Sequence, residues 1–371
     1  MNYREIEEDY ELLDLLENSQ IIESIAFQSL DFTEVEKLTT DKKFIDCIFL
    51  GCTIPDELKV RISVDNLIFP QIKGPFNPYR NRLYDRHSLF NDYELGNPNS
   101  YENTLDKQVY DHFLLNGKEA SDIKETLSRR LHDHAITDAL HDFLEDYDEK
   151  KIVAIMGGHS LERGNKNYLE VAKMSKKLTE LGYLMVSGGG PGAMEATHVG
   201  AWFADKEESE LVRAINILAE APSYKDKYWI DKAFEVLKLY PTTKYESVGI
   251  PTWLYGHEPP TPFATQIAKY FANSIREDGL LAIAKGGVIF SPGSAGTIQE
   301  IFQDATQNHY LSFGIASPMV FFNKKYWMTD RPVYPLLEKM LKEEKYENLI
   351  LSICDTGDEV IKEILKFTSE S

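Results

Sequence analysis

Two glycine-rich turns, about a hundred residues apart, constrain the fold of this chain most strongly. Each follows a short apolar run and opens onto a helical pattern: Ser187-Gly188-Gly189-Gly190-Pro191-Gly192-Ala193-Met194-Glu195, and Ser291-Pro292-Gly293-Ser294-Ala295-Gly296-Thr297-Ile298-Gln299-Glu300. A helix start leaves backbone N–H groups unpaired and carries the positive end of the helix dipole, and glycines let the main chain approach an anion closely. The two turns together predict a site for a phosphorylated ribose.

From residue 151 onward, apolar runs typical of strands alternate with amphipathic stretches typical of helices. The expected strands are residues 151–156, 183–187, 213–219, 247–251, 287–291 and 319–322. The expected helices are residues 168–181, 192–204, 262–280, 297–310 and 333–341. Apolar strands interleaved with helices indicate a parallel sheet covered on both faces, which binds ligands at the carboxyl ends of its strands. We therefore expect a Rossmann-like, doubly wound α/β domain over residues 146–371.

Residues 1–145 follow a different pattern. An acidic helical start precedes one strand candidate at residues 44–50, and a proline-punctuated stretch then leads to a mostly helical segment at residues 105–147. No internal repeat is evident. We expect an additional α-rich N-terminal unit whose role the sequence does not indicate, joined to the α/β domain near the polar run at residues 145–151.

Charge and composition exclude several classes of function. A formal charge of −20 at pH 7 argues against a nucleic-acid surface, because such surfaces use lysine and arginine to replace counterions. No apolar run is long enough to cross a bilayer, and the acidic first residues do not resemble a secretory signal. The three cysteines, Cys47, Cys52 and Cys354, match no zinc or redox motif. We expect a cytoplasmic protein with reduced thiols and a small ligand.

Each glycine turn also places a carboxylate near a helix start. Thr297-x-x-Glu300 is a capping box, in which Thr297 caps the helix and Glu300 reaches back. Capping alone requires no glycines, so the turn before it favours a functional role for Glu300. Glu195 either complements the helix dipole or faces the ligand.

A third turn of the same kind, Gly157-Gly158-His159-Ser160, follows the first expected strand. His159 either bonds a base or ribose hydroxyl or packs beside the turn. Arg276 is expected late in the helix at residues 262–280, where a solvated cation is the ordinary interpretation.

Two other chemistries are weakly indicated. Gly188, Gly190 and Ala193 form a G-x-G-x-x-A pattern, but it follows the second strand of the domain and has no acidic residue about 20 positions on, as a nicotinamide cofactor would require. A cluster of His132, His134, Asp138 and His141 suggests a metal, but the apolar face opposite indicates that the histidines face water. We expect neither a cofactor nor a metal.

Together these residues resemble the LOG ("lonely guy") family of Rossmann-like phosphoribohydrolases. The family signature P-G-G-x-G-T-x-x-E matches Pro292 to Glu300, with Ser294 at the second glycine. Within the family, the longer bacterial nucleotide 5′-monophosphate nucleosidases are most similar, through Gly157-Gly158-His159-Ser160, Gly190-Pro191-Gly192-Ala193-Met194-Glu195-Ala196 and Glu258-Pro259-Pro260-x-Pro262. The match covers residues 151–341.

The resemblance implies hydrolysis of the N-glycosidic bond of a nucleoside 5′-monophosphate to free base and ribose 5-phosphate, without a cofactor. Departure of the base leaves positive charge on the ribose, which a carboxylate stabilises, so Glu300 or Glu195 is the expected catalytic acid. The family also has an arginine upstream of the signature, for which Arg276 is the candidate. The residues expected to hold the 5′-phosphate are Gly293, Ser294, Ala295, Gly296 and Thr297.

An alternative from a different class is a nucleotide-binding sensor or carrier on the same fold, as in related molybdenum-cofactor carriers. A carrier would keep the glycine turns but would need neither carboxylate. The resemblance also implies a homo-oligomer, a dimer or larger. The preferred base does not follow from the sequence.

Overall fold

The computed structural model describes residues 3–370, and the chain divides into two compact units. Unit 1 consists of Met1–Leu83 and Leu115–His141, and unit 2 consists of Tyr84–Leu114 and Asp142–Ser371. The chain therefore enters unit 2 twice. The second entry lies close to the boundary expected near residue 145, but the segment Tyr84–Leu114 also belongs to the unit that carries the glycine turns.

Unit 2 is built on a seven-stranded sheet in which all strands are parallel. The strand order is β10-β9-β8-β7-β11-β12-β13. The strands are β7 (Ile152–Met156), β8 (Leu184–Ser187), β9 (Ser247–Gly249), β10 (Gln266–Ile267), β11 (Gly287–Phe290), β12 (Pro318–Phe322) and β13 (Ile350–Cys354).

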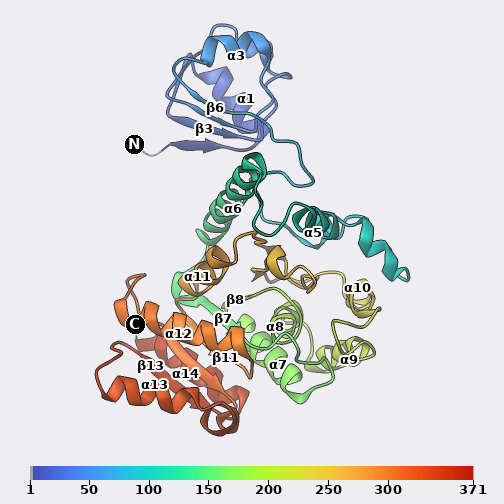
Figure 1. The fold of residues 1–371 in the computed structure, drawn as a ribbon, viewed down its shortest axis with the longest axis vertical. Helices are drawn as coiled ribbons and strands as arrows, with labels where there is room; N and C mark the ends of the chain where they lie inside the picture. Colours follow the sequence, from blue (N-terminus) through green and yellow to red (C-terminus); the bar gives the residue numbers. More distant parts are fainter. Residues whose placement is uncertain (1–2, 371) are drawn as a thin grey trace. The chain divides into compact units, whose positions relative to one another are not determined.

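Helices surround this sheet (Figure 1). They are α7 (Lys166–Glu180), α8 (Ala193–Trp202), α9 (Glu208–Leu218), α10 (Trp229–Leu239), α11 (Asn273–Ile283), α12 (Ala295–Tyr310), α13 (Val333–Lys342) and α14 (Gly357–Glu370). The unit also contains α4 (Arg86–Leu89), α5 (Leu105–Leu115) and the short elements η1 (Pro98–Asn103), η2 (Glu149–Lys151), η3 (Trp253–Tyr255) and η4 (Tyr326–Asp330). Neighbouring residues of one strand are both buried: Val320 packs into the cluster formed with α7 and α8, whereas Phe321 contacts the rings of Trp327 and Tyr334. The sheet is therefore covered on both faces, and the α/β doubly wound class is confirmed.

The strand order reverses at the centre of the sheet. The chain runs outward from β7 through β8 and β9 to β10, and then returns to place β11 on the other side of β7. Loops that leave two adjacent strands in opposite directions open a crevice at the carboxyl ends of those strands. Gly157 follows β7 and Ser291 follows β11, so two of the glycine turns border this crevice.

Two expected elements of unit 2 are wrong. Residues 213–219 are not a strand, because Leu211, Ala214, Ile215 and Leu218 of α9 form a buried stripe with helical spacing. The helix expected at residues 262–280 begins only at Asn273 of α11, after a segment that contains β10.

Unit 1 contains two small parallel sheets, in the orders β1-β3-β5-β6 and β2-β4. Its elements are β1 (Arg4–Ile6), α1 (Asp9–Asn18), β2 (Ile21–Glu23), β3 (Ile25–Gln28), α2 (Glu36–Thr39), β4 (Lys43–Ile45), β5 (Ile48–Leu50), α3 (Asp56–Ile62), β6 (Leu67–Phe69) and α6 (Ile123–Leu144). The α-rich expectation is thus corrected to an α/β arrangement with a helix after it.

Unit 1 also repeats itself, contrary to the expectation that no repeat is present. Residues 22 positions apart are paired in the sheets: Ile22 with Phe44, and Phe27 with Phe49. Left-handed backbone recurs at the same spacing, with φ of 57° at Ser29 and 63° at Gly51. These strands therefore form a short solenoid in which each coil places side chains at equivalent positions above those of the previous coil.

None of the described helices has the length and apolar content that a membrane-spanning helix requires. The three cysteines are buried and unpaired, and burial raises the pKa of each thiol.

The space around two helical glycines predicts opposite effects when each is replaced by alanine. A Cβ on Gly200 of α8 would lie 2.1 Å from the Ala172 carbonyl oxygen, so Gly200→Ala should destabilise the protein by about 1–3 kcal/mol. A Cβ on Gly279 of α11 would meet no atom within 4 Å, so Gly279→Ala should stabilise it by roughly 0.5–1 kcal/mol. Urea unfolding of both variants measures the difference, and equal effects would contradict the close contact.

Candidate functional site

A cavity of about 370 Å³ lies in unit 2 at the carboxyl ends of the central strands. It collects residues from the turns after β7, β8, β9 and β11 and from the first turns of α11 and α12. The lining residues are Gly157, Gly158, His159, Gly188, Gly190, Met194, Pro251, Thr252, Tyr255, Glu258, Arg276, Glu277, Ser294, Ala295, Gly296, Thr297, Gln299 and Glu300.

The N-terminus of α12 opens into this cavity. Ser294 is its N-cap residue and makes no side-chain capping bond. Ile298 N–H donates to the Ser294 carbonyl at 3.0 Å, so the amides of Ala295, Gly296 and Thr297 precede the first intrahelical hydrogen bond. Residues 294–296 are exposed. Open amides at the positive end of a 16-residue helix form a suitable site for an anion.

The turn before α12 is held in place by its neighbours. The Gly158 N–H donates to the Pro292 carbonyl at 3.2 Å, and the Tyr326 hydroxyl donates to the Gly293 carbonyl. Gly293 itself is absent from the lining, and a Cβ there would lie 2.0 Å from the Thr297 hydroxyl oxygen. Gly293 therefore permits the close turn rather than facing the cavity.

The glycine turn after β8 is not a second open cradle. Residues 188–192 are buried, and a Cβ on Gly188 would lie 2.6 Å from the sulfur of Met194. The first amide of α8, on Ala193, already donates to the Gly158 carbonyl at 3.3 Å. Gly188 and Gly190 border the cavity, whereas Gly189 and Gly192 do not. Of the two turns expected to offer open amides, only the one at α12 does so among the described residues.

Glu195 does not face the cavity, contrary to expectation. Its side chain is fully buried and accepts two hydrogen bonds from Arg163, to Oε1 at 2.6 Å and to Oε2 at 2.8 Å. The Tyr168 hydroxyl donates a third bond at 2.8 Å. Arg163 also donates to the Trp229 carbonyl at 2.9 Å. Glu195 therefore belongs to a buried ion pair that fixes the loop before α10.

Glu300 lies in the second turn of α12 and lines the cavity. Because Ser294 is the N-cap residue, Thr297 is already inside the helix and the expected capping box is not formed. Burial raises the pKa of Glu300 to about 7, Glu277 adds to the rise, and Arg276 opposes it. A carboxyl with this pKa exchanges its proton at neutral pH, as a general acid or base requires.

Arg276 is adjacent to Glu300, in the first turn of α11 and not late in a longer helix. Its guanidinium is 4.0 Å from a Glu300 oxygen and 3.1 Å from a Glu277 oxygen, and Nε donates to Asn273 at 2.9 Å. Gln299 donates to the other Glu277 oxygen at 2.9 Å. Glu277 therefore orients Arg276 beside the open end of α12.

A second polar group lies where the turns after β7 and β9 meet the cavity. His159 Nδ1 is 3.6 Å from a carboxylate oxygen of Glu258, and the two side chains are 43% and 16% exposed. Tyr255 of η3 lines the cavity beside them. Ser160 is exposed and lies outside the lining. The sequence indicates Glu258 only through the family resemblance, because a single glutamate before prolines has no chemical signature of its own.

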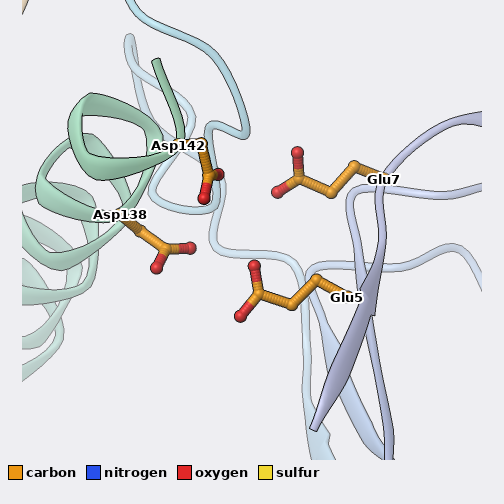
Figure 2. A group of neighbouring side chains, drawn as sticks. All are labelled: Glu5, Glu7, Asp138 and Asp142. Carbon is orange, nitrogen blue, oxygen red and sulfur yellow. The ribbon is translucent and has the colours of Figure 1, made fainter. Parts of the chain in front are cut away.

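The histidine cluster considered for a metal does not assemble. His134 is exposed, as expected, but His132 does not face water: it is buried against the ring of Phe76, and burial lowers its pKa. Figure 2 instead shows carboxylates: Glu5, Glu7 and Asp138, all of unit 1, bring oxygens within 4.8 Å of one another. Carboxylates at a partly exposed surface commonly occur without an ion, and we assign no ligand to them.

No family model matches the chain, and no curated protein matches it significantly. Similar solved structures include the molybdenum cofactor carrier protein of Chlamydomonas reinhardtii, at 12% identity over 59% of this chain and 98% of that one, with a TM-score of 0.36. The molybdenum cofactor binding protein of Rippkaea orientalis has 14% identity over 58% and 96%, with a TM-score of 0.34. A structural genomics target has 17% identity over 60% and 99%, with a TM-score of 0.38. These values are low, and the fold is assigned from the strand order of this chain itself.

The burial of Glu195 predicts a structural phenotype for its replacement. Glu195→Gln leaves the Arg163 charge buried without its partner, so unfolding free energy should fall by about 3–5 kcal/mol. Glu343→Gln, which breaks an exposed pair with Lys339, should change it by less than about 1 kcal/mol. Thermal and urea unfolding measure both, and a fully stable Glu195→Gln protein would contradict this role.

The pKa of Glu300 predicts a pH-dependent stability difference. Between pH 4.5 and about 7 the native state binds a proton at Glu300 that the unfolded state releases, so this group lowers stability as pH rises through that window. Glu300→Gln lacks the effect and should gain up to about 3 kcal/mol relative to the native protein by pH 8. Urea unfolding of both proteins from pH 4.5 to 8 tests this; a constant difference would contradict the raised pKa.

Proposed function

We propose that this protein hydrolyses the N-glycosidic bond of a nucleoside 5′-monophosphate, giving free base and ribose 5-phosphate. The observation that carries the proposal is Glu300: a carboxyl only 14% exposed, with its pKa raised to about 7, in the same cavity as the open N-terminus of α12. The motif resemblance to LOG-type phosphoribohydrolases, from Pro292 to Glu300, supports it.

The phosphate binds at the start of α12 in this mechanism. The amides of Ala295, Gly296 and Thr297 donate to its oxygens, and the Arg276 guanidinium supplies a positive charge nearby. The phosphate is remote from the bond that breaks, so its binding energy positions the ribose over Glu300.

Glu300 acts on the reacting carbon and on water. As the C1′–N bond breaks, its electron pair leaves with the base and positive charge develops on the ribose ring, which an ionised Glu300 stabilises. A water oxygen forms the new bond to C1′, and its proton passes to Glu300 and then to the departing base. A pKa near 7 lets the same carboxyl accept and release that proton.

The activity is tested by incubating the protein with AMP, GMP, CMP and UMP and measuring ribose 5-phosphate and free base. Hydrolysis of at least one nucleotide is expected, with Glu300→Gln slower by about 100-fold or more. The exposed Glu162→Gln, a matched loss of one carboxylate, should retain activity. Nucleosides without the phosphate should be poor substrates. Tight nucleotide binding with no turnover would instead indicate a carrier or sensor.

A further inference from the structure

Glu258 is a carboxylate that the proposed hydrolysis does not use. Its side chain is 16% exposed and lines the cavity, yet within residues 3–370 its carboxylate pairs only at long distances, with His159 at 3.6 Å and His257 at 3.7 Å. No ion pair joins it to Arg276 in the described part of the chain. Both oxygens of a partly buried acceptor are therefore available to a ligand.

Glu258 and Arg276 border different glycines of the turn after β8. A Cβ on Gly190 would lie 3.9 Å from a Glu258 oxygen, whereas a Cβ on Gly188 would lie 3.3 Å from the Arg276 guanidinium. A carboxylate repels a phosphate, so a bound nucleotide places its anion at Arg276 and α12 and its neutral part at Glu258. Only a group that donates N–H or O–H bonds satisfies this carboxylate.

Aromatic side chains next to Glu258 favour a ligand with a planar ring. Tyr255 lines the cavity with its side chain 44% exposed, and the Tyr255 carbonyl accepts the Glu258 N–H at 2.8 Å. The ring of Tyr224 stands edge-on to that of His159, with centroids 5.8 Å apart. A planar base can stack on the Tyr255 ring, whereas a ribose has no π-face to offer.

The loop that carries Glu258 is held in position by packing and hydrogen bonds to buried residues. Trp253 is fully buried, and its indole N–H donates to an Asp106 oxygen at 3.1 Å. The same carboxylate pairs with the buried Lys269. A Cβ on Gly256 would lie 2.3 Å from the ring of Tyr110, so α5 packs directly against the loop. An acceptor held in this way has a fixed position before the ligand binds.

We propose that Glu258 determines base specificity and selects guanine. Guanine presents its N1–H and its 2-amino group side by side, which satisfies both oxygens of one carboxylate. Hypoxanthine lacks the 2-amino group. Adenine and cytosine have a ring nitrogen acceptor beside their amino group, and a carboxylate repels that acceptor. This inference rests on the proposed function, since it assigns the substrate of that same cavity.

The experiment compares GMP with IMP, which differ only in the 2-amino group. In the native protein kcat/KM should be about 10- to 100-fold higher for GMP, because one hydrogen bond to a charged acceptor is lost with IMP. Glu258→Gln should bring the ratio close to one by lowering the value for GMP. Glu162→Gln, a loss of one exposed carboxylate in the turn after β7, should leave the ratio unchanged.

Calorimetric binding of GMP and IMP to Glu300→Gln separates this inference from the activity. Tighter GMP binding without hydrolysis by the native protein would refute the proposed function and retain the role of Glu258. Hydrolysis with equal values for GMP and IMP would refute the role of Glu258 alone. An equal loss for both nucleotides in Glu258→Gln would place the carboxylate on the ribose hydroxyls, and absence of both binding and hydrolysis would overturn both proposals.

Discussion

The backbone of Gly158 makes the two hydrogen bonds on which the cavity depends. Its carbonyl accepts from the first amide of α8 and its N–H donates to the carbonyl of Pro292, so one residue joins the turns after three central strands. The reversal of strand order brings β7 beside both β8 and β11, and these bonds fix the distance between the loops that follow them. The N-terminus of α12 is thereby held open next to Arg276 and Glu300.

Two glutamates near helix starts have opposite environments. Glu195 lies on a helix whose described residues are nearly all buried, and it is neutralised by Arg163 from a loop 32 positions earlier in the chain. Glu300 lies on α12, which has exposed as well as buried residues, and the Arg276 guanidinium is 4.0 Å from its carboxylate. The sequence analysis identified both carboxylates as candidate catalytic acids but could not choose between them. Arg163, which neutralises Glu195, is remote from it in the sequence.

The sequence analysis predicted the central strands of unit 2 and the helices α7, α8, α12 and α13 well, because long apolar runs next to glycine turns have few alternative folds. The prediction failed at α9, where one apolar run is compatible with both the strand and the helix period. It also failed before α11, where a buried segment does not form a regular helix. The open end of α12 was predicted from its glycines. The sequence did not predict that Met194 covers the turn after β8, because it does not indicate the direction in which this side chain points.

The repeat in unit 1 escaped the sequence analysis because two similar coils, with phenylalanine kept only at Phe27 and Phe49, give little internal similarity. In three dimensions the repetition has an evolutionary consequence. Each coil of a solenoid contacts only the coils next to it, and successive strands stack about 4.8 Å apart. Duplication or deletion of a whole coil would thus lengthen or shorten this unit by one step without altering the packing of the coils that remain.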